Sequence, residues 1–150
     1  MLLNSCSRLV LVSSSLWRAP AGIRCLASDS SVSGVLYNGP ADAPTVKLYT
    51  KAGCTLCDVA KGVLQEAAEE QPHTLVAVDI TDDEHANWWD KYKYDIPVLH
   101  IDDQYWAKHR ISLEASCEAL RQASEGTFEA QKGEPDAGRL ERPRNGPLKK

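Results

Sequence analysis

The chain has no apolar run long enough to cross a membrane. A membrane span needs roughly 20 consecutive apolar residues, whereas the uncharged, apolar-rich stretch at residues 9–17 is short and has an arginine on each side. The formal net charge of -4 and the lack of a basic stripe interleaved with aromatic residues argue against a nucleic-acid partner. Because internal repeats are also missing, 150 residues suit one domain of ordinary size. We therefore expect a single soluble domain with neither a membrane nor a nucleic acid as its partner.

Acidic residues are missing from the start of the chain, where the first one is Asp29. Residues 1–26 contain three arginines and five serines instead, a composition typical of a mitochondrial transit peptide. An arginine at position 24 predicts cleavage after Leu26 and a mitochondrial location, in the matrix. The alternative is a secretory signal peptide with residues 9–12 as its apolar region, but the scattered arginines and the serine-rich core favour a transit peptide.

The segments on either side of the central region lack sustained periodicity. Residues 27–44 are rich in Ser, Gly, Pro and Asp, which predicts a flexible lead-in. Residues 127–150 have almost no apolar side chains between Phe128 and Leu148. Such a stretch buries too little apolar area to offset the entropy of ordering it, so we expect a disordered tail. The folded domain is therefore predicted at residues 45–126.

Hydrophobic periodicity predicts the first elements of this domain. Residues 46–50 alternate as a strand does and run directly into the segment that ends at Cys54. Residues 75–80 form a nearly unbroken apolar run, which suits a central strand covered on both faces. Between these strands, a helix that ends at Pro72 is predicted by an apolar stripe with helical spacing. The stripe consists of Leu56, Val59, Ala60, Val63, Leu64, Ala67 and Ala68.

The second half of the domain is predicted from its turn and cap residues. Residues 81–84 have the Thr-x-x-Glu spacing of a capping box, which predicts a helix that continues to about residue 94. A strand at 97–101 and a returning strand at 105–109 form a hairpin around the two aspartates between them.

A third helix is predicted from Ser112, as its N-cap, to Gly126 at its C-terminus. The resulting order is βαβαββα. A helical crossover makes the first two strands parallel, and the hairpin adds antiparallel strands. The sequence thus predicts an α/β domain of the thioredoxin fold, with a four-stranded mixed sheet flanked by three helices.

Cys54 and Cys57 stand where the first strand turns into the first helix. Unpaired backbone N–H groups at a helix N-terminus stabilise negative charge, so a thiolate is favoured at Cys54. Lys51 adds positive charge nearby, and the spacer Thr55-Leu56 places the two sulfurs within reach of a disulfide. The predicted chemistry is thiol–disulfide exchange, in which the exposed Cys54 attacks a disulfide and the shielded Cys57 resolves the mixed disulfide.

Two other interpretations of the cysteine pair stay open. Structural zinc sites use the same spacing, but they need a second ligand pair, and the other cysteines and the four histidines show no fitting spacing. The pair could also be degenerate or merely structural. A strand followed by Cys-x-x-Cys and an amphipathic helix is the redox arrangement, so we expect no bound metal.

Residues 50–57 (Thr-Lys-Ala-Gly-Cys-Thr-Leu-Cys) resemble a glutaredoxin active site, and residues 95–98 (Asp-Ile-Pro-Val) resemble the segment that carries that family's cis-proline. The similarity covers residues 45–124 and is greatest to a glutaredoxin-like branch with a Cys-x-Leu-Cys motif. The resemblance implies a cis bond between Ile96 and Pro97 that faces the cysteines, with the Ile96 backbone ready to pair with a substrate strand. It also implies that Lys51 contacts a glutathione carboxylate. The candidate substrate-binding residues are Lys51, Thr55, Leu56, Ile96 and Pro97.

The chain departs from the family pattern in two places. Typical dithiol glutaredoxins have proline and an aromatic residue between the cysteines, where this chain has Thr55 and Leu56. A Gly-Gly pair that lets glutathione approach the family backbone is replaced by residues 107–110 (Ala-Lys-His-Arg). Lys108 or Arg110 could supply charge to glutathione by another route, or both could be solvated edge residues.

Four further features have simple structural explanations. Trp88, Trp89 and Tyr92 could form an exposed docking patch, although packing against the sheet explains the tyrosine and at least one tryptophan. Cys117 is expected to be a buried small apolar residue rather than a third redox centre. Asp79 is expected to cap the turn that follows its strand, and the histidines suggest no catalytic role.

These observations predict a mitochondrial enzyme of glutaredoxin type that acts as a monomer. Its substrates would be protein disulfides or glutathione mixed disulfides, and a thiol reductant would recycle Cys54 and Cys57. No cofactor is required, and glutathione is the candidate reductant. The alternative is a non-catalytic module that holds an iron–sulfur cluster or zinc at Cys54, or an adaptor.

Overall fold

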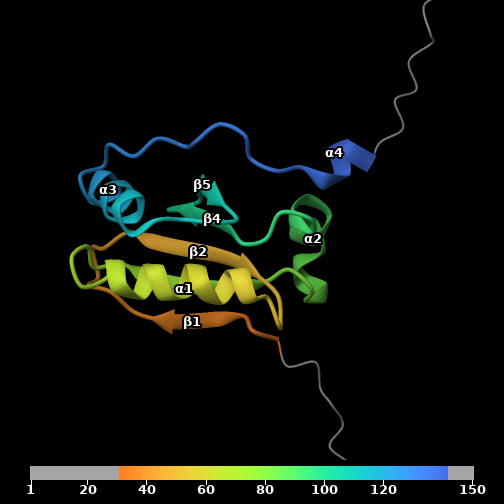
Figure 1. Ribbon diagram of the computed structural model, residues 1–150, viewed down its shortest axis with the longest axis horizontal. Helices are drawn as coiled ribbons and strands as arrows, with labels where there is room; N and C mark the ends of the chain where they lie inside the picture. The colour runs from red at the N-terminus through yellow and green to blue at the C-terminus, as the bar shows by residue number, and fades with distance from the viewer. Residues whose placement is uncertain (1–30, 142–150) are drawn as a thin grey trace, which may run out of the picture.

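The computed structural model describes residues 31–141, which form one mixed sheet and the helices around it (Figure 1). The strands are β1 (Gly34–Tyr37), β2 (Thr45–Thr50), β3 (Thr74–Asp79), β4 (Val98–Ile101) and β5 (Gln104–Lys108). The helices are α1 (Thr55–Ala67), α2 (Ala86–Tyr92), α3 (Leu113–Ser124) and α4 (Ala137–Glu141), with a 3₁₀ turn, η1 (Asp83–His85), before α2.

The strands lie in the order β1-β3-β2-β4-β5. β2 and β3 are parallel and are joined through α1, while every other neighbouring pair is antiparallel. The predicted hairpin is present as β4 and β5, and its two turn residues, Asp102 and Asp103, have positive φ angles of 46° and 68°. Such angles match the twist of the flanking strands in a two-residue hairpin. The arrangement confirms the predicted α/β fold of thioredoxin type.

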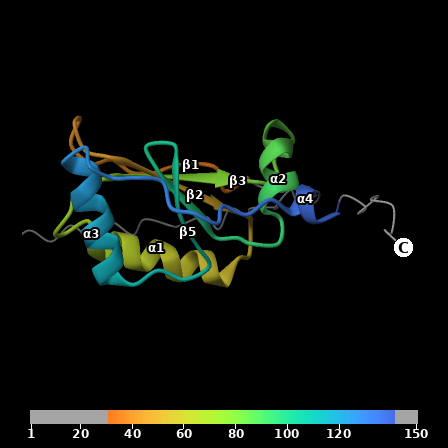
Figure 2. The ribbon, with the colours of Figure 1, turned by 90° about the horizontal axis from the view of Figure 1, so that it is seen from above.

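The two faces of the sheet carry separate apolar clusters, because neighbouring residues of a strand point to opposite sides. Leu48 belongs to the cluster under α1 and α3, whereas Tyr49 belongs to the cluster under α2. Figure 2 shows α1 and α3 together on one side of the strands, with α2 and α4 next to each other at one end. Helices therefore cover both faces of the sheet, as the predicted thioredoxin fold requires.

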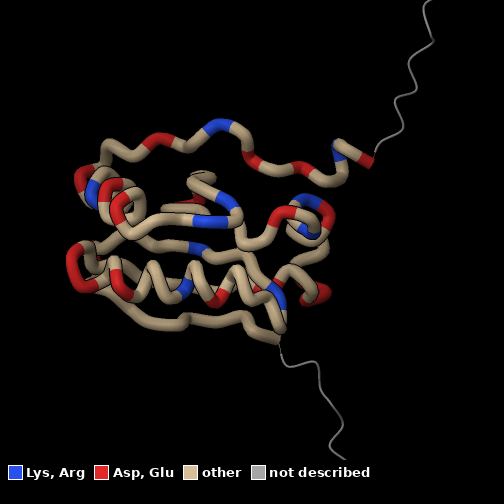
Figure 3. The backbone as a smooth tube through the Cα atoms, viewed as in Figure 1, with Lys and Arg blue, Asp and Glu red and all other residues tan. Residues whose placement is uncertain are grey.

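The sheet has five strands rather than the predicted four, because β1 lies within the segment predicted as a flexible lead-in. Its four residues pair antiparallel with β3, beginning at Gly34 and Ala77. No charged residue lies along β1 (Figure 3). Gly39, just beyond the strand, must be glycine, because a Cβ there would lie 2.6 Å from the carbonyl carbon of His73. Pairing with a distant strand orders a segment whose local composition favours flexibility.

The beginning of the segment predicted as a disordered tail also packs on the domain, as far as the structure describes it. Phe128 contacts the cluster under α1 and α3, and the N–H of Gln131 donates to the carbonyl of Tyr105 on β5 at 2.8 Å. The chain then passes along the sheet from α3 to α4, beside α2 (Figure 1). Ala137 in α4 is fully buried.

The most specific contact between this segment and the domain is made by the carboxylate of Glu134. Glu134 accepts hydrogen bonds of 2.5 Å from the hydroxyl of Tyr92 and from the ammonium of Lys91, both on α2. A few such anchored residues are enough to hold a segment that is mostly polar. Composition alone could not have shown them.

The predicted second helix is shorter than expected and starts later. α2 begins at Ala86, and the residue before the 3₁₀ turn is Asp82, which makes no side-chain capping bond. The hydroxyl of Thr81 donates to Asp79 at 2.6 Å, and among the described residues no helix N–H donates to it, so the expected cap is not formed. At the third helix the prediction is confirmed: Ser112 accepts a hydrogen bond from the N–H of Ala115. Gly126 follows with a φ of 70°, as expected at the end of a helix.

The predicted transit peptide, residues 1–26, lies outside the described residues. Within residues 31–141, no helix is long and apolar enough to span a membrane.

Candidate active site

A tight turn carries the chain from β2 to Cys54. The N–H of Cys54 donates to the carbonyl of Lys51 at 3.4 Å, and Gly53 has a φ of 72°, a conformation that favours glycine. Cys54 itself is extended, and its carbonyl accepts the first bond of α1, from the N–H of Asp58. The sequence therefore places the first cysteine at the N-cap of a 13-residue helix.

Cys54 and Cys57 are joined in a disulfide, with their Cα atoms 5.3 Å apart. The N–H of Cys57 donates to Sγ of Cys54 at 3.3 Å, so one orphan donor of the helix end already points at this sulfur. Cys54 is partly exposed, whereas Cys57 is 0% exposed. An incoming sulfur can reach only the first cysteine, and the second can reach only its neighbour.

The surface next to the disulfide is more apolar than the helical stripe predicted. Leu56 and Val59 are 38% and 61% exposed, whereas Ala60, Leu64 and Ala67 of the same predicted stripe are buried. The buried side of α1 follows Cys57, Ala60, Leu64 and Ala67, so Leu56 and Val59 lie at the edge of the stripe and face solvent. Thr55 is also exposed, so both spacer residues lie at the surface.

The Ile96–Pro97 peptide bond is cis, as predicted. Val98 pairs with Tyr49 in the β2–β4 ladder, which puts Pro97 beside the carboxyl end of β2, where the chain continues toward Cys54. The carbonyl of Pro97 accepts a hydrogen bond of 2.7 Å from the N–H of His109. The turn and loop hydrogen bonds of the described residues include none to the backbone of Ile96.

The positions predicted to provide positive charge differ in their surroundings. Lys51 is exposed and makes no ion pair with any residue from 31 to 141. Lys108 instead pairs with Asp95 at 2.6 Å. His109, which stands in the stretch that replaces the family's Gly-Gly pair, has a φ of 65° and lies 3.3 Å from the same carboxylate. Arg110 is exposed.

Asp79 is a structural residue, as the sequence suggested. Its carboxylate accepts hydrogen bonds from the hydroxyl and N–H of Thr81 and from the N–H of Val32. Burial acts to raise the pKa of this carboxyl, but the hydrogen bonds outweigh it and hold the pKa below its ordinary value. Asp79 therefore stays ionised at neutral pH and ties the lead-in segment to the end of β3.

The aromatic residues of α2 divide as predicted, with Tyr92 fully buried and Trp88 packed in the same cluster. Cys117 is partly buried against the other cluster, and burial, helped by Glu70, raises the pKa of its thiol. No group of three or more metal-ligating side chains lies together in the part of the chain that the structure describes. Sequence reasoning missed one feature, a cavity between β3 and α2, because its lining residues come together only in the fold.

Comparison with known proteins agrees with this geometry. Residues 45–123 match the glutaredoxin-like domain family (DUF836), a match that covers more than half of the chain. The chain is also 36% identical over 70 residues to the glutaredoxin-like protein YDR286C homolog of Dictyostelium discoideum. That alignment covers 44% of this chain and 65% of the relative, just under two thirds of the relative's length. With its dithiol and cis-proline both inside the matched region, the chain belongs to the glutaredoxin-like family, a redox-related branch of the thioredoxin superfamily.

Proposed function

We propose that the protein is a dithiol oxidoreductase that exchanges disulfides with proteins or with glutathione mixed disulfides. The observation that carries this proposal is the asymmetry of the cysteine pair, in which a partly exposed Cys54 at a helix N-terminus is bonded to a fully buried Cys57. A merely structural disulfide does not require one sulfur to be open to solvent at an anion-stabilising helix end.

The reaction proceeds in two exchanges. In the reduced protein, the thiolate of Cys54 attacks one sulfur of the substrate disulfide, that S–S bond breaks, and the departing thiolate takes a proton from water. Cys57 then loses its proton and attacks Sγ of Cys54. The mixed disulfide breaks, the second substrate thiol leaves, and the protein has lost two electrons to the substrate.

The reduced state is restored by an external thiol. We propose glutathione for this step, with Lys51 as the cation that pairs with one of its carboxylates, because Lys51 is exposed and has no ion-pair partner among residues 31–141. Two glutathione molecules supply the two electrons and leave as glutathione disulfide. No bound cofactor takes part in this cycle.

A trapping experiment tests the proposal. Cys57→Ser protein, incubated with a glutathionylated peptide, should accumulate a mixed disulfide at Cys54 that mass spectrometry identifies, whereas the parent protein should turn over. Cys117→Ser is the matched control and should turn over like the parent, because Cys117 lies in another part of the fold, against the cluster under α1 and α3. A Cys57→Ser protein that forms no adduct would contradict the proposed activity.

A further inference from the structure

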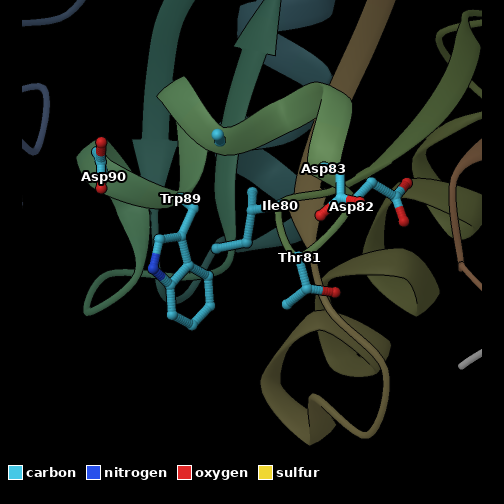
Figure 4. Close-up of a pocket in the computed structure, with 7 residues that line it drawn as sticks. Ile80, Thr81, Asp82, Asp83, Trp89 and Asp90 are labelled. Atoms are coloured by element: carbon cyan, nitrogen blue, oxygen red, sulfur yellow. The ribbon is translucent and has the colours of Figure 1, made fainter.

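An open cavity of about 320 Å³ lies between the end of β3 and α2. Its apolar wall is formed by Ile80, Ala86 and Trp89, and its rim carries the carboxylates of Asp82, Asp83 and Asp90 (Figure 4). No lysine or arginine lines it. An apolar wall under a rim of one charge is suited to a ligand that is apolar along its length and cationic at its end.

The cavity opens at the same end of the sheet as the disulfide. The N–H of Ile80 donates to the carbonyl of Thr50 at 2.9 Å, and only three residues separate Thr50 from Cys54. Adjacent strands lie about 4.8 Å apart. A polypeptide whose disulfide engages Cys54 can therefore extend toward the cavity.

Trp89 exposes an indole without an aromatic partner. Its neighbour Trp88 packs on Tyr49, with ring centroids 4.6 Å apart, and stacks on Tyr92. Trp89 is 39% exposed, and no aromatic or cation–π contact within residues 31–141 involves it. Figure 4 shows its ring next to Ile80. A large exposed indole beside a reactive centre is typical of a binding surface.

The three carboxylates at the rim of the cavity differ in their hydrogen-bond partners. Asp82 accepts hydrogen bonds from the hydroxyls of Ser31 and Ser33, at 2.6 and 2.7 Å. Among the described residues, the side chains of Asp83 and Asp90 have no hydrogen bond or ion pair. Asp83 and Asp90 thus leave negative charge at the rim of the cavity that no hydrogen bond or ion pair of residues 31–141 engages, which complements a cation.

We propose that this cavity binds the side chain of an arginine that flanks the target disulfide in a substrate protein. This inference rests on the proposed function and specifies its substrate class. A guanidinium can lie flat on an indole face while its N–H groups donate to carboxylates at the rim, and its three-carbon stem can lie against Ile80 and Ala86. Lysine, with a more strongly hydrated point charge, fits the flat indole less well.

Binding is tested without any exchange chemistry. The full chain is titrated with three peptides in which serine replaces cysteine and the neighbouring residue is arginine, lysine or leucine, while the indole N–H resonance of Trp89 is followed by NMR. The arginine peptide should shift this resonance and bind about tenfold more tightly than the leucine peptide. Trp89→Ala, followed through peptide fluorescence, and the double variant Asp83→Asn/Asp90→Asn should each lose this preference.

Asp58→Asn is the matched control, because Asp58 is an exposed carboxylate on α1 outside the cavity. It should keep the preference for arginine. Equal binding of the three peptides, tighter binding of leucine, or an equal loss of preference in Asp58→Asn would overturn the inference.

The corresponding disulfide peptides separate this inference from the proposed function. Both the proposed function and the arginine site are supported if kcat/KM for the arginine disulfide exceeds that for the leucine disulfide by about tenfold and the double variant removes this difference. Exchange at equal rates on all peptides supports the function and overturns the arginine site. Selective binding of the arginine peptide without any exchange overturns the function alone.

Discussion

At the scale of single residues, the reactivity of the protein is set at Sγ of Cys54. This sulfur lies at the N-cap of α1 and accepts a hydrogen bond from the N–H of Cys57. Both interactions stabilise the thiolate more than the thiol, so the pKa of Cys54 in the reduced protein should fall below the roughly 8.5 of an ordinary cysteine. The rate of alkylation by iodoacetamide, measured from pH 4 to pH 10 in Cys57→Ser protein, should report this midpoint.

The same experiment contains its own reference. Burial raises the pKa of Cys117, so this thiol should alkylate later in the titration and more slowly than Cys54. Peptide mapping distinguishes the two sites. A Cys54 midpoint at or above that of an ordinary thiol would show that the helix end does not activate it.

Two buried histidines make stability depend on pH. His73 contacts the hydroxyl of Tyr37 at 2.6 Å, and His100 contacts that of Tyr92 at 2.9 Å. Burial lowers the pKa of both imidazoles. Below pH 6.5 the unfolded chain therefore takes up protons before the folded chain does, and the free energy of unfolding should fall by up to about 1.4 kcal/mol per histidine and pH unit.

Urea unfolding at pH 7.5, 6.5 and 5.5 measures this effect, since carboxylates of the unfolded chain titrate mainly below this window. The protein should be less stable at pH 5.5 than at pH 7.5. Replacing both histidines by glutamine should flatten the dependence on pH, whatever its effect on the absolute stability. A double variant with an unchanged slope would remove the buried imidazoles as its cause.

At the scale of elements, the sequence predicts what depends on local pattern. The long apolar stripe of α1, the two-aspartate turn of the hairpin and the cap at Ser112 all act through neighbouring residues, and all are present. β1 was missed because its four residues owe their conformation to pairing with β3, more than 30 residues away. The predicted start of α2 is wrong because, within the described residues, Thr81 bonds only to Asp79 and accepts no hydrogen bond from the following turn.

The apolar stripe of α1, which is buried at some positions and exposed at others, gives a prediction about stability. Leu64 is 0% exposed and belongs to the main apolar cluster, so Leu64→Ala should lower the free energy of unfolding by about 2–5 kcal/mol. Val59→Ala removes apolar groups from the same helix at an exposed position and should change it by less than about 0.5 kcal/mol. Chemical denaturation of both variants makes the comparison, and similar losses would mean that Val59 is packed in solution.

At the scale of the whole molecule, some features of the candidate site can be predicted from sequence motifs, whereas others depend on the assembled fold. Motifs predicted the cysteine pair, whose disulfide the structure contains, and the cis bond at Pro97. The exposure of Leu56 depends on which side of α1 faces the sheet, and the cavity beside Trp89 depends on how α2 packs at the end of β3. No local pattern specifies either. The identities of chemical groups can be predicted from the sequence, whereas the shape of the surface around them requires the assembled fold.

The segment after α3 contributes to the stability of this assembly. Glu134 accepts a hydrogen bond from the buried Tyr92 and pairs with Lys91, so Glu134→Ala should lower the free energy of unfolding by about 1–2 kcal/mol. Glu129→Ala is the matched control, because the side chain of Glu129 is exposed and makes no hydrogen bond or ion pair within the described residues. Equal stabilities of the two variants would contradict a stabilising role for Glu134.

The two segments that flank the family match, one containing β1 and the other containing α4, pack on opposite edges of the sheet. A recombinant fragment trimmed to residues 45–123 would strip the partner strand from β3 and uncover the hydroxyl of Tyr92. Laboratories that express this domain for screening or spectroscopy should therefore design clones that extend at least from Ser31 to Glu141. The segment that matches the family is therefore shorter than the segment that packs together as the folded domain.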